Sequence, residues 1–264
     1  MSGLSLQNLH VYYGKREIIH DLSVDALPSG QLIAVLGANG CGKSSLLKAL
    51  AGLIKSTGKI AFDEHEQPVN QADATVQRIV YLPQNLPEAL HLTVLESVLA
   101  AANASYVFTD KAKAQRDIPM VLDLLTRLGI AHLAMQFLDQ LSGGQRQLVG
   151  LAQALVRHPQ VLLLDEPLSA LDLNYQFHVM DLVRSETIAR NMTTLIVLHD
   201  INIALRHTDH VLVIKDGRLL ASGKPREVLT PALLSAAYGV RARVEACSQG
   251  IPHLLVDGLE SISL

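Results

Sequence analysis

The stretch from Ile33 to Lys48 constrains the fold more than any other part of the chain. A short apolar run enters it, a glycine-rich turn follows, and a pattern typical of a helix ends it, reading IAVLGANGCGKSSLLK. From Gly37 to Ser44 the turn matches G-x-x-x-x-G-K-[ST] without a mismatch. The backbone amides of such a loop, at the N-terminus of a helix, form an anion site that glycines let a ligand approach closely. We therefore predict a phosphate-binding loop between a buried strand and a helix, in preference to an ordinary glycine-rich turn.

Two polar side chains of the loop indicate that the anion is a nucleoside triphosphate. We expect the Lys43 ammonium to reach the β- and γ-phosphates, and the Ser44 hydroxyl to bind Mg²⁺. Cys41 is most simply a small residue that fills space within the loop.

The composition is that of one large domain, or of a core with a subdomain, because the chain has 264 residues. No run reaches the roughly 18 apolar residues of a membrane span and no signal peptide is visible, so we expect a cytoplasmic protein. With 22 basic and 25 acidic residues, the net charge of −3 gives no general attraction to nucleic acid. The two cysteines are too few for a disulfide framework or a cysteine-rich zinc site. The mean hydropathy of +0.25 indicates that partners cover some apolar surface.

Polar side chains follow the ends of three predicted strands, which span residues 79–82, 161–164 and 195–198. In open α/β sheets the carboxyl ends of the strands line the ligand crevice, so we expect these side chains beside the phosphate loop. Carboxylates there suit Mg²⁺ and water handling, with Asp165 holding the metal and Glu166 orienting the attacking water. Without the phosphate loop, a solvated acidic turn would be the simpler interpretation. The side chains concerned are Gln84, Asp165, Glu166 and His199.

Residues 86–160 change character and predict an inserted helical subdomain. Pro119 is expected in the first turn of the second of its helices, where the missing donor costs little. Ahead of the third helix, Ser142 is a good N-cap that precedes Gly143, Gly144 and Gln145. An ordinary capped helix is the simpler interpretation, and a second phosphate-binding surface made by exposed amides is the sharper one. The helices are predicted at residues 94–102, 118–128 and 148–156.

The remaining pattern predicts an α/β fold with a mostly parallel sheet. Residues 4–27 contain short strand-like pieces around a turn at Gly14-Lys15. Tyr13 could stack there on a purine base, although a packed edge aromatic is commoner and Tyr12 competes for the role. We expect a P-loop core from residues 1–85 and 161–225 that includes an antiparallel N-terminal piece, the helical subdomain, and a C-terminal extension at 226–264. Further helices are predicted at 45–54, 175–189 and 231–238, with strands at 32–36, 59–62, 211–214 and 219–221 and a hairpin within 240–264.

The order of these motifs resembles that of the nucleotide-binding cassette of ABC transporters. The phosphate loop, Gln84, Leu-Ser-Gly-Gly-Gln, Leu-Leu-Leu-Asp-Glu-Pro, Ser-Ala-Leu-Asp and His199 follow one another across nearly the whole chain. The resemblance implies an ATPase in which Tyr13 stacks on the base, Gln84 senses the metal and the transmembrane partner, and His199 contacts the γ-phosphate. It implies that Asp172 lies in the loop that crosses a dimer interface. The other nucleotide-binding residues that it implies are Gly37, Ala38, Asn39, Gly40, Cys41, Gly42, Lys43, Ser44, Ser45, Ser142, Gly143, Gly144 and Gln145.

The resemblance also implies a homodimer. Each chain carries one phosphate loop and one Leu-Ser-Gly-Gly-Gln signature. In an ABC dimer each ATP takes the loop from one copy and the signature from the other. The implied working unit is therefore a head-to-tail pair that sandwiches two ATP with Mg²⁺.

Segments 197–206, 215–219, 223–234 and 238–240 resemble the ATPases of iron-siderophore, haem and cobalamin importers. Those ATPases act at the cytoplasmic face of the inner membrane, with a permease pair and a periplasmic binding protein. The segment from Asn85 to about Lys113 would then face the coupling helices of the permease. Three alternatives stay open: an ATPase of a zinc or other importer or of an exporter, a non-transport cassette ATPase acting on DNA or the ribosome, and a nucleotide-binding module without hydrolysis. The acidic balance and the complete set of carboxylates argue against the last two.

Overall fold

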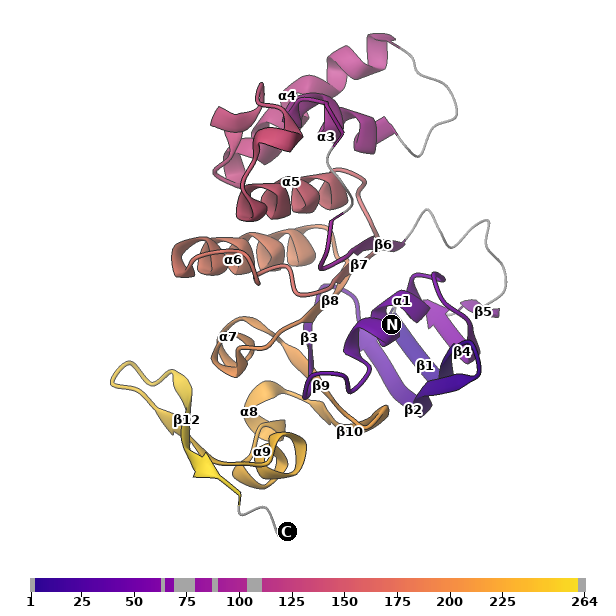
Figure 1. Cartoon of the computed structure of the whole chain (residues 1–264), viewed down its shortest axis with the longest axis vertical. Coiled ribbons are helices and arrows are strands. Elements are labelled where there is room, and N and C mark those ends of the chain that lie inside the picture. The colour runs from indigo at the N-terminus through magenta and orange to yellow at the C-terminus, as the bar shows by residue number, and fades with distance from the viewer. Residues whose placement is uncertain (1–2, 63–64, 69–78, 87–89, 104–110, 261–264) are drawn as a thin grey trace.

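The computed structural model describes residues 3–62, 65–68, 79–86, 90–103 and 111–260. Within them the largest sheet has the strand order β10-β9-β3-β8-β7-β6, and β10 at one edge is antiparallel to β9 while the other neighbours are parallel. Helices cover one side of this sheet and a second sheet lies on the other side (Figure 1). The predicted α/β fold with a mostly parallel sheet is confirmed. The strands are β3 (Leu32–Leu36), β6 (Ile79–Leu82), β7 (Val161–Leu164), β8 (Thr193–Val197), β9 (His210–Lys215) and β10 (Arg218–Gly223).

The second sheet is antiparallel and has the strand order β2-β1-β4-β5. The sequence predicted several short pieces, whereas the first two strands are long and are joined by the predicted turn at Gly14-Lys15. Register shifts interrupt their pairing, and near one of them Asn8, at φ 48°, bonds through Nδ2 to Asp21 Oδ1 at 2.7 Å. Because a bulge changes which face a residue presents, one bulged strand resembles two short ones in sequence. The strands are β1 (Gly3–Tyr13), β2 (Arg16–Pro28), β4 (Ser56–Phe62) and β5 (His65–Pro68).

Hydrophobic side chains cover both faces of the parallel sheet and form two cores. Along β3, Leu32, Ala34 and Leu36 belong to one core, and Ile33 and Val35 belong to the other. All five are buried, which explains why this strand is apolar without interruption. Helix α1 packs in the core beside the antiparallel sheet, whereas α3 to α7 pack in the opposite core. The helices are α1 (Lys43–Leu50), α3 (Val94–Asn103), α4 (Lys111–Arg127), α5 (Gly143–Leu155), α6 (Leu173–Ala189) and α7 (Ile201–His207), with 3-10 turns at Ala131–Leu133 and Leu138–Gln140.

Helix α1 is shorter than predicted, because it ends at Leu50 and not at Ile54. Gly52 adopts φ 70°, and the backbone N–H of Leu53 bonds to the Lys48 carbonyl at 2.9 Å. A left-handed glycine with such a bond closes the last turn of a helix. Leu53, which the prediction places inside the helix, therefore lies beyond the end of α1 and is 61% exposed.

The prediction for Pro119 is wrong. The structure has this proline inside α4, which begins at Lys111, and not in a first turn. Residues 111–115 are Lys, Ala and Gln, which are good helix formers, so the helix starts before the proline. Since proline has no backbone N–H, one hydrogen bond of α4 is missing at this point.

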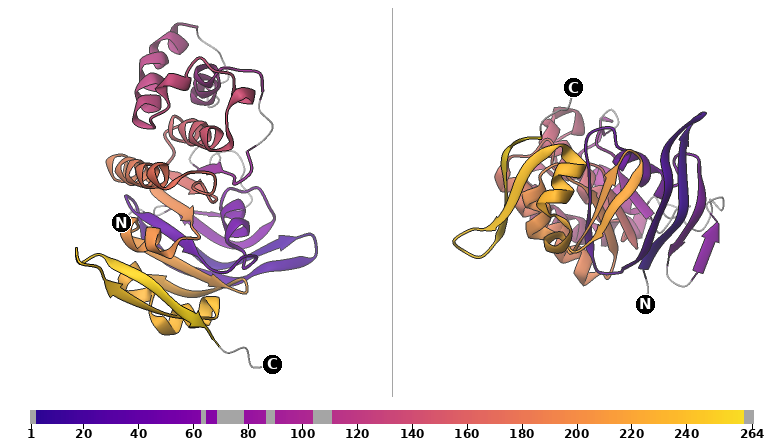
Figure 2. Two further views of the ribbon diagram at one scale, coloured as in Figure 1. Left: turned by 60° about the vertical axis from the view of Figure 1, so that its left-hand side comes forward. Right: turned by 90° about the horizontal axis from the view of Figure 1, so that it is seen from below.

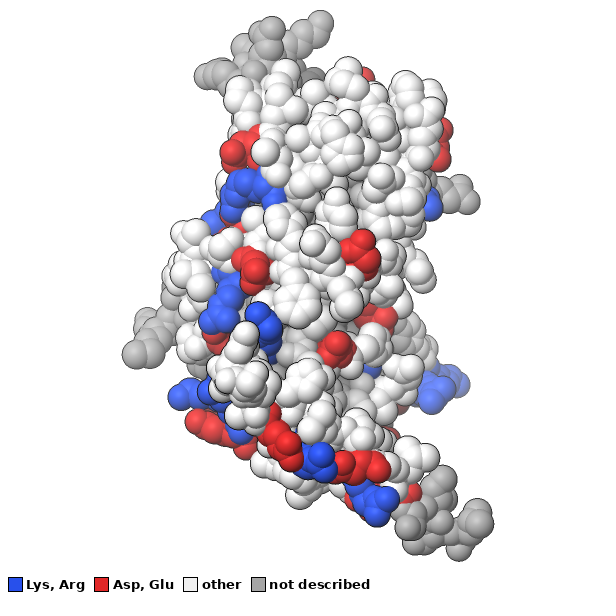
Figure 3. All heavy atoms as spheres, turned by 90° about the vertical axis from the view of Figure 1, so that its left-hand side faces the viewer, with Lys and Arg blue, Asp and Glu red and all other residues white. Residues whose placement is uncertain are grey.

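The C-terminal residues form helices α8 (Pro225–Val228) and α9 (Pro231–Tyr238) and the hairpin of β11 (Val240–Ala246) with β12 (Pro252–Leu259). The predicted bounds of α9 are confirmed: Thr230 Oγ1 accepts from the Leu233 amide at 3.2 Å, and Gly239 ends the helix at φ 69°. The hairpin lies beside α9 at the lower end of the molecule (Figure 2). Arg243 in the hairpin pairs with Glu245 and Asp257 at 2.7 and 2.8 Å. On the face drawn in Figure 3, acidic and basic side chains alternate across the lower end of the molecule. Among the described residues, no helix has the length and apolar character that a membrane crossing requires.

Candidate functional site

The glycine-rich loop connects β3 to α1 as the sequence predicts. Gly37 adopts φ 145°, and a β-carbon there would lie 2.1 Å from the carbonyl oxygen of Ile214 on β9. Gly42 adopts φ 110°, and a β-carbon there would lie 2.6 Å from the side chain of Ile19 on β2. Both positions combine a left-handed backbone with a close approach, so only glycine fits them. The loop therefore packs closely against β9 of the parallel sheet at one end and against β2 of the antiparallel sheet at the other.

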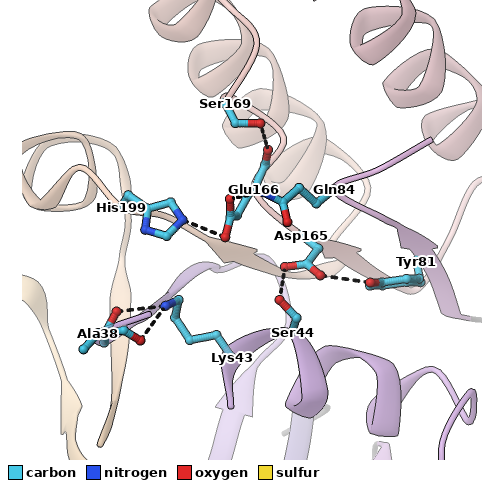
Figure 4. Close-up of polar contacts among 10 residues, drawn as sticks. Ala38, Lys43, Ser44, Tyr81, Gln84, Asp165, Glu166, Ser169 and His199 are labelled. Carbon is cyan, nitrogen blue, oxygen red and sulfur yellow. Dashed lines mark hydrogen bonds and ion pairs between the residues drawn. The ribbon is translucent and has the colours of Figure 1, made fainter. Parts of the chain in front are cut away.

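Lys43 spans this loop with its side chain. Only 5% of the residue is exposed, and Nζ donates to the carbonyl oxygens of Gly37 at 2.9 Å and Ala38 at 3.0 Å (Figure 4). These bonds use two of the three donors of the ammonium. A buried positive charge is thus fixed at the loop, which favours an anion there.

Asp165 follows β7 and lies directly opposite the start of α1. Its carboxylate accepts from Ser44 Oγ at 2.8 Å and from the Tyr81 hydroxyl at 2.9 Å, although it is only 2% exposed (Figure 4). The structure therefore brings Ser44 and Asp165 together as predicted. Burial and, secondarily, the charge of Asp165 raise the pKa of Tyr81, so its phenol stays neutral and donates.

Glu166 lies between two other strand ends. Its Oε2 accepts from Gln84 Nε2 at 2.5 Å, and its Oε1 is 2.6 Å from Nε2 of His199 (Figure 4). Strands β6, β7 and β8 are neighbours in the sheet, which is why Gln84, Glu166 and His199 meet at its carboxyl edge. Glu166 also has φ 52°, a left-handed conformation that is uncommon for a non-glycine residue. The loop after it supports this conformation, because Ser169 Oγ donates to the Glu166 carbonyl at 3.1 Å.

A pocket of about 150 Å³ opens beside the Glu166 and His199 side chains. Its walls combine these polar groups with apolar side chains such as Leu168 and Ile203. A carboxylate at the wall of a pocket this size can hold and orient a water molecule.

The Leu-Ser-Gly-Gly-Gln segment begins α5. Ser142 Oγ accepts from the Gln145 amide at 3.3 Å, and Gln145 Oε1 accepts from the Ser142 amide at 2.9 Å, which is a reciprocal capping box. A β-carbon at Gly144 would lie 2.7 Å from the Ala170 carbonyl, so this helix packs closely on the loop before α6. Asp172 in that loop caps α6 through its bond to the Tyr175 amide at 3.0 Å. Because α5 and α1 pack on opposite faces of the parallel sheet, this segment is not part of the cluster around Ser44 and Asp165.

Comparison with known proteins assigns the family. Residues 19–169 match the family described as ABC transporter, which is more than half of the chain. The chain belongs to the ABC transporter ATP-binding family. It is an ATPase that binds ATP, and its Gly37–Ser44 loop and Asp165-Glu166 pair both lie within the matched region.

Relatives of this ABC ATPase align over nearly its whole length. The hemin import ATP-binding protein of Pseudomonas entomophila is 36% identical over 92% of this chain and 94% of its own. The ferric enterobactin transport ATP-binding protein of Escherichia coli is 35% identical over 90% of this chain and 88% of its own. Among solved structures, an inward-facing metal-chelate type ABC transporter has a TM-score of 0.80 at 30% identity, covering 97% of both chains. The similarity therefore includes the C-terminal residues outside the family match.

Sequence reasoning missed one residue of the ABC ATPase site, Tyr81. Its register partner on β7 is Leu163, two residues before Asp165, and its side chain lies on the same face as that of Ile79. The signal that could have revealed it is a hydroxyl on an otherwise apolar strand beside the strand that ends in the carboxylates. Tyr13 lies at the end of β1 and is 46% exposed, so its ring is accessible from solvent.

Proposed function

We propose that this ATPase drives an importer of iron-siderophore, haem or cobalamin-type chelates. Two copies of the chain would sandwich two ATP with Mg²⁺ and act on a permease pair, which receives its substrate from a periplasmic binding protein. The chain would then lie peripherally on the cytoplasmic side of the membrane. The alternatives are an ATPase of a zinc or other importer or of an exporter, and a non-transport cassette ATPase.

The similarity over nine-tenths of the chain to proteins named for hemin import and ferric enterobactin transport carries this proposal. The family match ends at residue 169, whereas these relatives align over 92% and 90% of the chain. The shared region therefore includes most of the residues after the ATPase motifs, where members of different transport classes would be expected to differ. The structural likeness to a metal-chelate type transporter, which covers 97% of the chain, supports the same conclusion.

The residues around Asp165 fit Mg²⁺. This ion prefers oxygen ligands, keeps several waters and is usually held by one or two carboxylates together with substrate phosphates. The site offers the Ser44 hydroxyl and the Asp165 carboxylate 2.8 Å apart, next to a loop suited to phosphates. We propose that both hold the ion, Asp165 through water, and that Gln84 approaches it from the end of β6. When bound, the ion neutralises negative charge that develops on the phosphates.

Glu166 is proposed to orient and polarise the attacking water. It borders the pocket with His199, and in this structure both of its carboxylate oxygens have partners, Gln84 and His199. Each carboxylate oxygen can accept a second hydrogen bond, and the release of one partner would leave Glu166 free to turn toward the attacking water. We infer that His199 turns to the γ-phosphate and Gln84 to the metal when ATP binds, which would free Glu166. Positioning and charge neutralisation then suffice, because phosphoryl transfer to water needs no covalent enzyme intermediate.

The homodimer is proposed from the opposite placement of the two phosphate-binding elements. Helix α1, which follows the phosphate loop, and helix α5, which follows the signature, pack in different cores. A second copy placed head to tail would bring its Ser142–Gln145 segment to the phosphates held by the first. Asp172 and the exposed Leu173 begin α6 next to that segment and would face the partner. The proposed permease-facing segment, residues 85–113, lies partly outside the described residues.

Glu166→Gln tests the catalytic assignment and the dimer together. This substitution keeps the shape of the side chain and removes its charge, so ATP should bind with unchanged affinity while turnover is abolished. The purified variant should then elute as a dimer with Mg²⁺-ATP and as a monomer without nucleotide, measured by light scattering. Normal turnover by the variant would refute the role of Glu166, and a monomer at saturating ATP would refute the sandwich.

Uptake by cells that lack the chain tests the substrate class. We expect loss of accumulation of one labelled ferric siderophore, hemin or cobalamin, with recovery by the wild-type chain and not by Glu166→Gln. Unchanged uptake of all three classes, with a loss of zinc uptake, would favour the zinc-importer alternative. Co-purification with ribosomes or DNA and not with membranes would favour the non-transport alternative.

A further inference from the structure

A buried carboxylate connects the helical subdomain to the rest of the chain. Glu186 lies in α6 and is only 3% exposed. Its Oε1 pairs with Arg127 at the end of α4, and its Oε2 lies 2.5 Å from Nη2 of Arg190, which follows α6. A carboxylate buried this deeply needs cations beside it, because an unpaired charge in the interior is strongly destabilising. The cluster of Arg127, Glu186 and Arg190 therefore holds the end of α4 against α6.

Two further bonds connect α6 and its C-terminal end to the last turns of α4 and α5. Arg190 Nη1 donates to the carbonyl oxygen of Leu155, the last residue of α5, at 2.7 Å. His178 of α6 lies with Nε2 2.7 Å from the carbonyl oxygen of Arg127. The last carbonyls of a helix lack donors within the helix, and here residues in and after α6 supply donors to them. In Figure 1, α3, α4 and α5 lie together above α6.

Packing between the same helices is less directional than these bonds. Helices α4 and α6 contribute to one hydrophobic core, for example through Leu125 and Val183. The hydrophobic effect that favours such contacts is non-directional. A guanidinium presents its donors in a rigid plane, so its bonds to a carboxylate have a defined geometry. The cluster around Glu186 therefore adds a constraint on direction to the packing of the subdomain.

This direction determines where the signature lies, because the signature is at the far end of α5. Helix α5 has 13 residues from Gly143 to Leu155, so Ser142 lies one helix length from the bond at Leu155. At 1.5 Å per residue this length is about 20 Å, and a rotation of about 10° around the Leu155 end would move Ser142 by about 3 Å. A displacement of that size breaks any hydrogen bond between the segment and a ligand.

We propose that Glu186 is a positioning residue that sets the orientation of the helical subdomain, and with it the place of the Ser142–Gln145 segment. Glu186 does not touch the nucleotide. It acts through Arg127 on α4 and through Arg190 on the end of α5. The part of this inference in which the segment meets ATP held by a second copy rests on the proposed dimer, whereas the orientation within one chain does not.

Pulsed electron paramagnetic resonance on the full-length chain without nucleotide tests the orientation directly. Spin labels are attached at Met135→Cys in the subdomain and Leu53→Cys after α1, both exposed positions, once Cys247→Ser has removed the exposed native thiol. Arg127→Gln should widen the distribution of distances between the labels or shift it by about 3 Å, as the rotation of α5 requires. An unchanged distribution would overturn the proposal.

Arg184→Gln is the matched control. The side chains of Arg184 and Arg127 are both 39% exposed, and Arg184 Nη2 donates to Asp209 Oδ1 at 2.9 Å. This pair joins α6 to the residue before β9 and not to α4. The control should lower Tm and leave the distance distribution unchanged. An equal widening in both variants would overturn the proposal, because it would assign the effect to a general loss of stability.

Arg127→Lys keeps the test decisive if Arg127→Gln does not fold. Lysine retains a positive charge for Glu186 and lacks the planar fork that gives the bonds their direction. Its distance distribution should be wider than that of the wild-type chain and narrower than that of Arg127→Gln. Where Arg127→Gln does not fold, a distribution identical to that of the wild-type chain would overturn the proposal.

Dimerisation gives a second readout, measured in the Glu166→Gln background. With Mg²⁺-ATP, Arg127→Gln should raise the Kd of the dimer about tenfold, which corresponds to a correct orientation in about one chain in ten. The Kd for ADP, which reports on the phosphate loop of one copy, should stay within about twofold of that of the parent. An unchanged dimer Kd, or an equal rise of both constants, would overturn the proposal. If the Glu166→Gln parent stays monomeric, the sandwich is refuted and the distance distribution alone decides the orientation.

Discussion

The bond between Tyr81 and Asp165 gives a prediction whose size follows from the structure. Tyr81→Phe removes a hydroxyl that donates at 2.9 Å to a carboxylate in a residue only 2% exposed. Hydrogen bonds to charged groups contribute about 1.5–3 kcal/mol, and a buried carboxylate oxygen that loses such a donor keeps its desolvation cost. We therefore expect the free energy of unfolding to fall by about 1.5–3 kcal/mol. For a chain of this length, Tm should fall by roughly 3–12 °C.

Thermal and urea unfolding, followed by circular dichroism, measure this loss. Tyr12→Phe, which makes the same chemical change on β1 of the other sheet, is the control and should cost less. A double-mutant cycle with Asp165→Ala isolates the pair, because the hydroxyl should matter little once the carboxylate is gone. We expect a coupling of about 1.5 kcal/mol, and additive effects within about 0.5 kcal/mol would refute the reasoning.

Three further predictions concern packing and charge outside this pair. Gly144→Ala puts a β-carbon 2.7 Å from a backbone carbonyl and should cost about 1–3 kcal/mol in urea unfolding, whereas Gly143→Ala, with open space around it, should be neutral or stabilising. Arg190 Nη2 lies 2.5 Å from Oε2 of the buried Glu186 carboxylate, and Arg190→Ala removes this cation. The free energy of unfolding should fall by about 2–4 kcal/mol, and an unchanged Tm would contradict this. Burial lowers the pKa of His207 in the folded chain. As the pH falls below about 6.5, the histidine therefore takes up a proton in the unfolded chain before it does so in the folded chain. The free energy of unfolding should decrease over this pH range. His207→Gln should reduce that slope between pH 8 and pH 5, and a steeper slope would show that the sign is wrong.

The sequence predicted the structure best where the direction and burial of a strand determine the environment of its residues. The strands at 32–36 and 161–164 could be predicted because parallel strands buried on both faces have no polar positions. The cluster of Gln84, Glu166 and His199 could be predicted because neighbouring parallel strands end at one edge. Both inferences need only the direction of the strands.

The structure departs from the sequence prediction where a distant segment or a local irregularity determines the bounds of an element or the partner of a side chain. Pro119 lies inside α4 because the residues before it favour a helix strongly enough to continue through it. The sequence predicted short pieces in place of the long strands β1 and β2, because a bulge at Asn8 shifts the alternation of apolar residues. Tyr81 was missed because the partner of its hydroxyl is 84 positions away in the chain. The bond of Tyr81 has no local signature, whereas the residues before Pro119 carried a helix signal that the prediction did not weigh.

The same reasoning applies to the C-terminal extension, which follows all the predicted motifs in the chain. The Leu254 amide of β12 donates to Asn202 Oδ1 at 2.7 Å, and Asn202 lies in the first turn of α7, three residues after His199. The extension therefore contacts the helix that follows the histidine. This contact uses no residue that we assign to catalysis, and the two partners are 52 positions apart in the chain. A link of this kind between the extension and an element next to the site can be recognised only once the chain has folded.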